Sequence, residues 1–459
     1  MQPSGPVELT PVHLRRPSPP VLRRRLQKTL RTFGPRLAPL LAQRVVGREV
    51  PTPAIARQVR RSFAQLGATY VKLGQLIASA PGVFGPEVST EFRALLDSAH
   101  TVPLQRVQDV IRKDLGRPIE DVFASFDPTP IGCASIAVVH RATLCDGREV
   151  AVKVTRPGIR RKVAADLAIM GTILPRLASR LSGGDASLVA PLLEGLREQL
   201  SEELDLRNEA RTMDHFRGLI DEVGLEGVMI PEVISEASGE RVLTMELLDG
   251  VPIDDLEAVE ELGLDPTPLL STLVRMWFLT TARDGVFHGD VHAGNLLLLR
   301  DGRMAVLDWG ILGRLEPETH EHFRSIIAAA LGDEDAWARV TTRVADQIGP
   351  MMTARLGIAP EDVPLFVRRV VEPLLTAPFG EVQLSTLFLG PGADDGPGLG
   401  FLRREAPGDP SGAALPPIEF DRGMFLLIKQ LLYFERYGKM YLGDVALLDD
   451  HEFFSRLVS

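Results

Sequence analysis

The segment His288–Asn295, followed by Asp308-Trp309-Gly310, constrains the fold of this chain more than any other feature. Between these two motifs lie two short apolar runs, residues 296–299 and 304–307, joined by an Asp-Gly turn. Apolar runs around such a turn predict a β-hairpin of buried strands. Because a hairpin returns the chain to the end at which it started, we expect the two motifs to lie close together.

The side chains of these motifs have the types and spacing that phosphoryl transfer needs. Asp290 stands five positions before Asn295, and Asp308 opens a D-x-G turn. In phosphotransferases the first Asp accepts or orients the proton of the acceptor, while the Asn and the D-x-G Asp bind Mg²⁺. The pattern therefore predicts an Mg·ATP site with catalytic Asp290 and the metal ligands Asn295 and Asp308.

The same loop also reads as His-x-Asp-x-His. His288, Asp290 and His292 would supply two imidazoles and a carboxylate to a transition metal. This alternative gives Asn295 and Asp308 no role, so phosphoryl transfer is favoured. Either histidine could equally be structural and hold the loop by bonding backbone carbonyl groups.

Composition narrows the class of protein. The 459 residues predict about three domain-sized units, and 45% hydrophobic with 24% charged residues is ordinary for a globular chain. No charge-free apolar run approaches the ~18 residues of a membrane-spanning helix. The two cysteines, Cys133 and Cys145, give neither a disulfide framework nor a zinc pattern. We expect a cytoplasmic protein whose membrane contact, if any, is peripheral.

The charge is unevenly distributed. Residues 1–50 hold ten basic and two acidic side chains, a local charge of +8, which leaves −18 on the rest of a chain whose net charge is −10. Four apolar residues recur there at helical spacing, as in an interfacial helix: Leu22, Leu26, Leu30 and Phe33. The pattern predicts either a segment that binds an anionic membrane or a solvated, disordered tail. Because aromatic residues do not interleave with the basic ones, we expect no nucleic-acid partner.

Periodicity divides the rest of the chain into three parts. Residues 51–125 form a helical extension, residues 126–247 a lobe with a sheet and inserted helices, and residues 248–459 a helical lobe with a Gly/Pro-rich loop over 390–417. Helices are predicted over about 54–79, 86–99, 104–115, 163–181 and 191–216. Strands are predicted over 136–144 and 149–154 as a hairpin, and over 228–233 and 241–247 as a pair. The fold class is α+β, with a hinge near residues 246–250.

A strand lysine is predicted to contact the nucleotide. Lys153 lies in the alternating strand Val150–Val154, a motif that places a lysine over the α- and β-phosphates in kinases. A Glu from the following helical stretch would be needed to pair with it. That stretch offers several acidic residues, Glu202, Glu203, Asp205 and Glu209, among which helix pattern alone does not choose.

The loop Gly132-Cys133-Ala134-Ser135 stands where a phosphate cradle would lie. A single glycine makes a poor cradle, because Cβ atoms keep the backbone N–H groups from closing over a phosphate. The Ser135 hydroxyl could compensate as a donor, and an ordinary β-turn is the alternative.

Together these segments resemble the UbiB/AarF (ADCK) family of atypical kinase-like ATPases. The decisive match is Lys72-Leu73-Gly74-Gln75, the family's K-x-G-Q signature, which ordinary protein kinases lack. Further matches are Pro130–Ile136 for the alanine-rich loop, Val150–Ile159 for the lysine strand, Glu203-Leu204-Asp205 for the E-x-D motif, and Val242–Glu246 for the strand before the hinge. The resemblance runs from about Ala54 to Leu315.

The resemblance implies a two-lobed, protein-kinase-like fold with a helical N-terminal extension packed on the cleft. Lys72 and Gln75 would then lie near Glu203 and Asp205. Since the family's lysine partner comes six residues after the first Glu of E-x-D, the resemblance selects Glu209 as the partner of Lys153.

For the nucleotide, the resemblance implies binding by the loop Gly132–Ser135, by Lys153 and by the hinge residues Glu246 and Leu247, with ATP and Mg²⁺ as cofactors. The implied activity is ATP hydrolysis or phosphotransfer to a small or lipid-like acceptor. It would support isoprenoid quinone biosynthesis at a membrane, with a lipid or quinone precursor and biosynthetic complex proteins as partners.

The chain departs from the family pattern in four places. Gly132 and Cys133 replace alanines, Ala137-Val138 replaces Gly-Gln, and Trp309 replaces the Phe of D-F-G. The hydrophobic membrane helices that often close bacterial members are not found at the end of this sequence. The first two departures leave the preference between ATP and ADP open.

Two other functions stay open. Aminoglycoside and choline kinases share the H-G-D-x-H-x-x-N wording, so a small-molecule phosphotransferase is one alternative, and a nucleotide-binding regulatory scaffold is the other. The K-x-G-Q motif favours the kinase-like ATPase.

Overall fold

The computed structural model describes residues 7–78, 86–95, 102–181, 189–356, 359–378, 422–446 and 450–458, with positions 381 and 448. The predicted loop over 390–417 lies outside these residues. The chain divides into two compact units. Unit 2 comprises Glu8–Asp214 and Pro231–Leu247, and unit 1 comprises Met1–Val7, His215–Ile230 and Leu248–Ser459. The last change of unit along the chain, at Leu247–Leu248, falls inside the predicted hinge.

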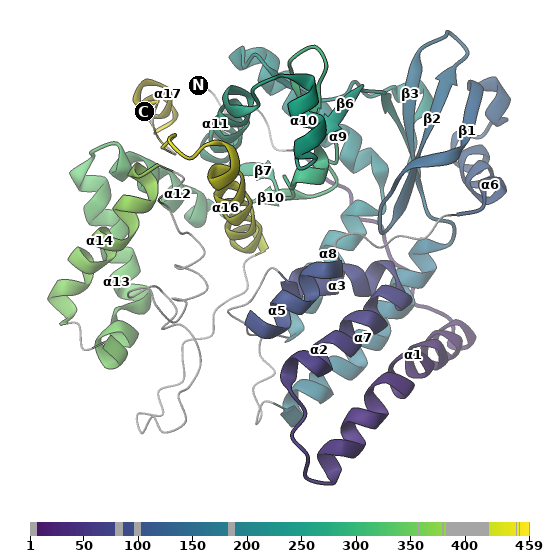
Figure 1. The fold of residues 1–459 in the computed structure, drawn as a ribbon, viewed down its shortest axis with the longest axis horizontal. Helices are drawn as coiled ribbons and strands as arrows, with labels where there is room; N and C mark the ends of the chain where they lie inside the picture. Colours follow the sequence, from purple (N-terminus) through teal and green to yellow (C-terminus); the bar gives the residue numbers. More distant parts are fainter. Residues whose placement is uncertain are drawn as a thin grey trace. The chain divides into compact units, whose positions relative to one another are not determined.

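Unit 2 contains a four-stranded antiparallel sheet in the order β1-β2-β3-β5 (Figure 1). The strands are β1 (Phe123–Cys133), β2 (Ala137–Leu144), β3 (Glu149–Thr155) and β5 (Val242–Glu246). The predicted β2–β3 hairpin is confirmed. Strand β1 escaped prediction because Pro128 and Pro130 interrupt its pattern, and an edge strand is the place in a sheet that tolerates proline. Helix α6 (Leu104–Leu115), predicted with these bounds, packs its apolar side chains on the sheet.

The predicted pairing of residues 228–233 with 241–247 is largely wrong. Strand β4 (Val228–Met229) pairs in parallel with a strand of unit 1, while β5 pairs with β3. A single bridge, Val233 to Met245, joins the two segments. Alternation identified apolar strands but not their partners, because register depends on the rest of the sheet.

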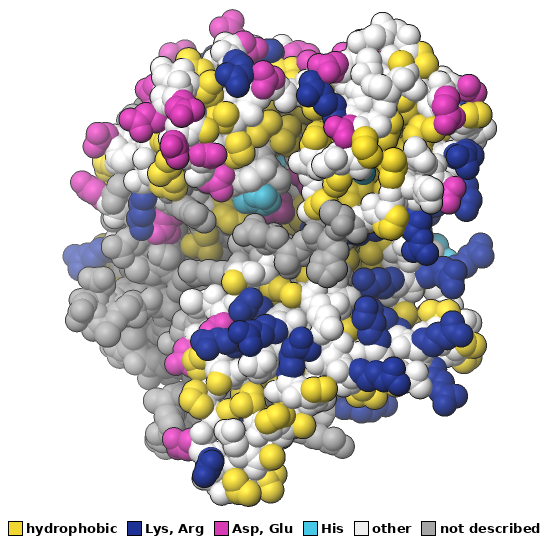
Figure 2. Space-filling view, turned by 45° about the vertical axis from the view of Figure 1, so that its right-hand side comes forward, with side chains coloured by type: hydrophobic (Ala, Val, Ile, Leu, Met, Phe, Trp, Pro, Cys, Tyr) yellow, Lys and Arg dark blue, Asp and Glu magenta, His cyan; other side chains and the backbone are white. Residues whose placement is uncertain are grey.

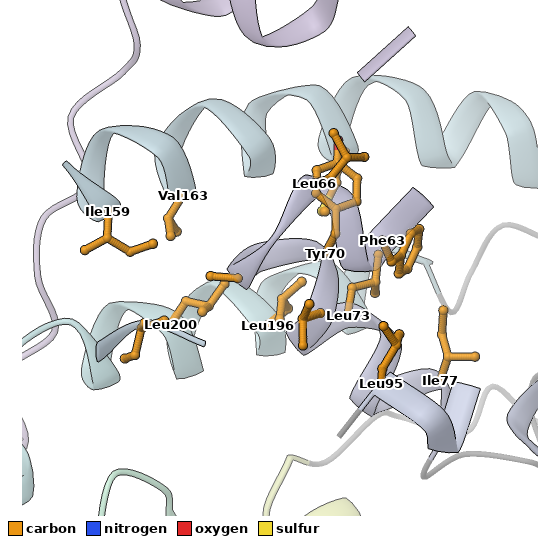
Figure 3. Packing of buried hydrophobic residues seen from close by; sticks show 14 of the residues in the cluster. Phe63, Leu66, Tyr70, Leu73, Ile77, Leu95, Ile159, Val163, Leu196 and Leu200 are labelled. Carbon is orange, nitrogen blue, oxygen red and sulfur yellow. The ribbon is translucent and has the colours of Figure 1, made fainter. Parts of the chain in front are cut away.

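Unit 2 contains the helices α1 (Pro19–Val45), α2 (Thr52–Leu66), α3 (Ala68–Ala78), α5 (Pro86–Phe92), α7 (Ile159–Leu181), α8 (Val189–Glu203) and the first half of α9 (Leu206–Val223), with the short helices η1 (Arg93–Leu95), η2 (Ile119–Asp121) and η3 (Ser235–Ala237). The buried residues of the apolar cluster shown in Figure 3 come mainly from α2, α3, α5, α7 and α8. The single helix predicted over 54–79 is broken at Gly67, whose φ of 90° is incompatible with an α-helix. The helix predicted over 191–216 is likewise broken, between Glu203 and Leu206.

Of the two alternatives predicted for the basic segment, a helix and a disordered tail, residues 19–45 form the helix α1. Its inner side carries Arg25, whose Nη2 donates to Asp166 Oδ2 at 2.8 Å and to the carbonyl of Leu66 at 2.9 Å. Thr69 Oγ1 donates to the same carboxylate at 2.9 Å. These bonds fasten α1 to α7 and to the junction between α2 and α3. The face that packs inward is thus polar in part, whereas Leu30 of the predicted apolar face is 59% exposed.

Unit 1 contains two small sheets. One has the order β4-β9-β8-β6, and the other pairs β10 with β7. Their strands, beside β4, are β6 (Gly250–Pro252), β7 (Val286–His288), β8 (Leu296–Leu299), β9 (Met304–Val306) and β10 (Leu312–Arg314). The predicted β8–β9 hairpin is confirmed. Strands β6, β7 and β10 are three residues long, too short to produce a periodic pattern.

The remaining elements of unit 1 are helical. They are α10 (Leu256–Leu262), α11 (Thr267–Asp284), η4 (Ala293–Asn295), α12 (Pro317–Ala330), α13 (Glu334–Leu356), η5 (Pro360–Asp362), α14 (Val363–Thr376), α16 (Arg422–Tyr441) and α17 (His451–Val458). Trp277 of α11 lies at the centre of an aromatic cluster with Phe278, Phe287, Phe323 and Phe434. Among the described helices of both units, none combines the length and apolarity needed to cross a membrane.

Candidate functional site

The loop that begins at Asp290 is held at both ends by buried strands of unit 1. Strand β7 leads into it, and Trp277 Nε1 donates to the carbonyl of His288 at 3.1 Å. The β8–β9 hairpin leads out of it and returns the chain, so that Leu307 N–H donates to the carbonyl of Asn295 at 2.9 Å. The predicted proximity of the two sequence motifs is thereby confirmed.

His288 connects the two motifs directly. Its Nδ1 accepts the N–H of Asp290 at 3.0 Å, so the proton is on Nε2, which donates to the carbonyl of Asp308 at 2.6 Å. Burial lowers the pKa of His288 to about 4 and keeps the ring neutral, as this pair of bonds requires. Both ring nitrogens are therefore engaged by backbone groups, and His288 is structural.

The transition-metal alternative fails for the same reason. A ligand nitrogen must present its lone pair to the metal, and His288 has none to offer. Within the described part of the chain, no group of three or more His, Cys, Asp and Glu side chains is arranged to hold a metal ion.

Asn295 and Asp308 have the chemistry of Mg²⁺ ligands. The Asn295 amide nitrogen donates to the carbonyl of Asp290 at 3.0 Å, which makes its oxygen the atom suited to a metal. Asp308 Oδ1 accepts the N–H of Gly310 at 3.0 Å, and this bond shapes the D-x-G turn. Amide and carboxylate oxygens are hard ligands of the kind Mg²⁺ takes, so the residues present fit this ion.

Trp309 occupies the position of the D-F-G Phe and stabilises the turn. It is 1% exposed, its Nε1 donates to the carbonyl of Val306 at 2.9 Å, and its ring lies 4.5 Å from that of His288 and 4.7 Å from that of Phe216. The larger ring is thus accommodated by packing and by its own hydrogen bond.

Unit 1 also contains residues that sequence reasoning missed. Lys429 of α16 extends its Nζ to 2.6 Å from Asp290 Oδ1, and Gln430 Oε1 accepts the N–H of Val291 at 2.9 Å. One signal in the sequence was available. Lys429 is the lone charged residue between Arg422 and Glu435, in an otherwise apolar helix. A lone charge in such a helix indicates a specific buried partner.

In unit 2, Lys153 and Glu209 form the expected contact. Lys153 Nζ lies 2.7 Å from Glu209 Oε1, and their side chains are 7% and 3% exposed. The lysine is held in place because β3 is a central strand, paired with both β2 and β5. The pair therefore holds the ammonium group at a fixed point on the strand.

The segment predicted as the loop Gly132–Ser135 is partly strand, since Gly132 and Cys133 end β1 and Ala134 and Ser135 begin the tight link to β2. Ala134 N–H donates to the carbonyl of Ala137 at 3.0 Å, and Arg156 Nε donates to the carbonyl of Ala134 at 3.0 Å. A Cβ on Gly132 would make ordinary 3.5 Å contacts with Val139, so space does not require a glycine there. Cys133 is exposed and Ser135 half-buried.

Glu246 ends strand β5, and Leu247 is the last residue of unit 2. Glu246 N–H donates to the carbonyl of Glu232 at 2.9 Å, and Leu247 N–H makes a long bond of 3.4 Å to the carbonyl of Glu149. The segment predicted as a hinge is therefore anchored on its unit 2 side.

The K-x-G-Q residues meet only part of the E-x-D motif. Lys72 Nζ lies 2.9 Å from Glu203 Oε1, and Gln199 Nε2 donates to the same oxygen at 2.7 Å. Asp205 instead pairs with Arg207 at 2.7 Å. Gln75 is half-buried one turn further along α3. The expected Lys72 contact is thus present with Glu203, while Asp205 closes the junction between α8 and α9.

The predicted residues gather in three groups. Asp290, Asn295 and Asp308 lie together in unit 1, joined there by Lys429. Two ion pairs, Lys153–Glu209 and Lys72–Glu203, lie in unit 2.

Comparison with known proteins agrees with this geometry. The model of the ABC1 atypical kinase-like domain matches residues 94–341. The chain is 35% identical over 417 residues to the chloroplastic aarF domain-containing protein kinase At5g05200 of Arabidopsis thaliana, covering 85% of this chain and 73% of that one. It is 37% identical over 403 residues to Rv0647c of Mycobacterium tuberculosis, covering 86% and 76%. It is 30% identical over 362 residues to the "Probable protein kinase UbiB" of Xanthomonas campestris, covering 74% of this chain and 62% of that one.

Proposed function

The chain belongs to the UbiB/AarF family of ABC1 atypical kinase-like proteins, and from that premise we propose that it binds Mg·ATP and cleaves the γ-phosphate bond. The phosphoryl group passes to water or to a small or lipid-like acceptor. The observation that carries the proposal is the convergence of Asp290, Asn295 and Asp308 through His288 and the β8–β9 hairpin. The buried Lys153–Glu209 pair supports it independently.

Each residue takes a role that its chemistry allows. Asn295 and Asp308 hold Mg²⁺, which when bound neutralises charge on the phosphates. Asp290 orients the acceptor and receives its proton. Lys153, held by Glu209, contacts the α- and β-phosphates, and the loop Gly132, Cys133, Ala134 and Ser135 lies beside the phosphates, with the Ser135 hydroxyl as a donor because the Ala134 N–H is already bonded to the carbonyl of Ala137. Glu246 and Leu247 contact the base. The proposed acceptor is small, because the K-x-G-Q helix of this family lies where a protein substrate would bind, and the Lys72–Glu203 pair supports the same role here.

The proposed place of action is an anionic membrane surface, with a role in isoprenoid quinone or lipid metabolism. Figure 2 shows Lys and Arg side chains gathered over the helical part of unit 2, with few acidic ones among them. On α1 the exposed cations are Arg23, Arg24, Lys28, Arg31 and Arg44. The end of α1 also exposes Leu41, Val45 and Val46, by 58%, 86% and 72%. Basic and apolar groups together are what a peripheral membrane helix uses.

The function is tested by ATP hydrolysis with the purified full-length chain. We expect slow, Mg²⁺-dependent hydrolysis that rises with anionic vesicles, and a fall of at least about 10²-fold in Asp308→Asn, because the metal ligand is lost. Asp301→Asn is the matched control. This exposed aspartate lies in the turn of the same hairpin and pairs with Arg303. Equal hydrolysis by Asp308→Asn and the wild type would refute the mechanism.

Two further results would redirect the assignment. Rapid stoichiometric phosphorylation of one small alcohol would identify a small-molecule kinase, and tight nucleotide binding without turnover would identify a scaffold. The quinone role is tested in cells by comparing a deletion strain with a strain carrying Asp308→Asn. We expect quinone to fall in both, and normal quinone in the Asp308→Asn strain would separate the pathway from the chemistry.

A further inference from the structure

Helix α16 supplies a cation to the loop that contains Asp290. Lys429 Nζ lies 2.6 Å from Asp290 Oδ1 and 3.4 Å from the carbonyl of Gly289. The Lys429 side chain is 14% exposed and that of Asp290 is 21% exposed. The pair is therefore shielded from bulk water yet open enough for both groups to reach a substrate.

Neighbouring residues of α16 fix the same loop. Gln430, which is fully buried, accepts the N–H of Val291 and donates to its carbonyl at 3.5 Å. The Lys429 ammonium group lies 5.5 Å from the centre of the Tyr433 ring, and that ring packs 6.4 Å from the ring of His292. Neighbouring side chains of α16 thus hold both Lys429 and the loop that it contacts.

The loop has no cation of its own. The six residues from Asp290 to Asn295 are Asp, Val, His, Ala, Gly and Asn. The reaction, however, concentrates negative charge on the three oxygens of the transferred phosphoryl group, and phosphotransferases place cations there. A lysine suits this task, because its ammonium group is a point charge on a flexible stem.

We propose that Lys429 is a catalytic residue that contacts the phosphoryl group during its transfer. This inference rests on the proposed function. The ammonium group rests on Asp290 without nucleotide and donates a hydrogen bond to a γ-phosphoryl oxygen when Mg·ATP is bound. Helix α16, which is distant in sequence, thereby supplies the cation that the loop of Asp290 lacks.

The transfer step balances without any further reactant. The acceptor oxygen forms a bond to the γ-phosphorus with its lone pair, and the bond from that phosphorus to the bridging oxygen breaks, leaving its electron pair on ADP. The acceptor proton passes to the Asp290 carboxylate. Lys429 keeps its proton throughout and acts through its charge and hydrogen bond.

The test compares Lys429→Met with Lys439→Met in the full-length chain. Lys439 lies on the same helix, where it pairs with Glu435 at 2.6 Å and is 43% exposed. We expect kcat for Mg·ATP hydrolysis to fall about 10²-fold in Lys429→Met, with the nucleotide Kd within about threefold, because the contact forms in the transition state. Lys429→Arg should retain an intermediate kcat. Lys439→Met should keep the wild-type kcat, and because it removes a partner of the buried Glu435 its melting temperature is measured as well.

A purely structural role is separated by chemical rescue. In Lys429→Ala, added ethylammonium should raise kcat at least about tenfold, because it returns a cation to the site. Methanol at the same concentration carries no charge and should not raise kcat. If Lys429 only filled space, ethylammonium would not restore activity through its charge. Unchanged kcat in Lys429→Met would overturn the inference, and so would a higher kcat, since Lys429 would then block Asp290. Failure of the proposed function looks different: the wild type itself would show no hydrolysis that Asp308→Asn abolishes.

Discussion

Several buried charged side chains of this protein are held in position by a partner of opposite charge. Lys153 and Glu209 are both nearly inaccessible, and each would cost several kcal/mol to bury alone. Paired, they fix an ammonium group at a chosen point on a central strand. Asp290 and Lys429 follow the same rule in unit 1, at slightly greater exposure. Burial explains why these side chains hold one geometry, whereas exposed pairs of equal length do not.

Lys162 is half-buried, and nearby opposite charges offset the cost of burying its ammonium group less fully than in these pairs. Burial, with a smaller effect of nearby Arg25, lowers its pKa from 10.5 to about 8. Below pH 8 the lysine is charged in both the folded and the unfolded state, so the full free-energy cost of burying its charge lowers the stability of the fold. Between pH 8 and 10.5 the unfolded state binds the proton and the folded state releases it, so stability rises with pH.

Lys162→Met should therefore raise the apparent free energy of unfolding by about 1–2 kcal/mol at pH 7, and the gain should shrink towards zero by pH 10. Urea unfolding of both proteins at pH 7, 8.5 and 10 measures the difference. A loss of stability that is equal at all three pH values would show that Lys162 stabilises the fold through packing.

At the scale of elements, Gly74 sets the distance between α3 and its neighbours. A Cβ at this position would overlap Leu95 and would lie 3.1 Å from Phe92 and 3.2 Å from Phe63. The glycine of K-x-G-Q thus allows α3 to pack closely on α2, α5 and η1. Lys72 and Gln75 flank it on the same helix, so the packing of Gly74 also fixes where these two side chains begin.

Gly74→Ala should lower the apparent free energy of unfolding by about 1–3 kcal/mol, because α3 must shift. Gly171→Ala is the matched control, since Gly171 lies within α7, is exposed, and leaves open space where the alanine Cβ would stand. That change should raise stability by about 0.5–1 kcal/mol through helix propensity. Thermal unfolding checks both, and an equal effect of the two alanines would contradict the packing argument.

At the scale of the whole molecule, each unit has its own core and its own part of the chemistry. The basic N-terminal helix α1 is attached to the core of unit 2, because Arg25 is bound to Asp166 there. Deleting residues 1–50 would therefore leave a buried carboxylate without its partner. A deletion would damage the fold and would be a poor test of membrane binding.

Neutralising four exposed cations of α1 is the cleaner test. Replacing Arg23, Arg24, Lys28 and Arg31 by Gln should weaken sedimentation with anionic vesicles at least tenfold, since each cation contributes up to about 1 kcal/mol near such a surface. The melting temperature should stay within a few degrees of the wild type. Full retention of vesicle binding would exclude α1 as the membrane contact. Replacing four exposed arginines of unit 1, Arg300, Arg303, Arg339 and Arg456, by Gln makes the same change in net charge and is the control.

Much of the fold followed from local pattern. The helix Leu104–Leu115 and the β2–β3 and β8–β9 hairpins were predictable, because alternation, helical spacing and Asp-Gly turns act over a few residues. The breaks at Gly67 and after Glu203, the pairing of β4 with β9, and the strands of three residues were not. Each of these depends on contacts between segments far apart in the chain.

The candidate site divides in the same way. The sequence alone determined the types and spacing of Asp290, Asn295 and Asp308, and motif resemblance selected Glu209 for Lys153. Only the tertiary structure decided that His288 is neutral and structural, that α1 is anchored by Arg25, and that Lys429 lies 2.6 Å from Asp290. The physical reason is that spacing along the chain fixes chemistry within one element, whereas burial and charge pairing are set by whichever elements the fold brings together.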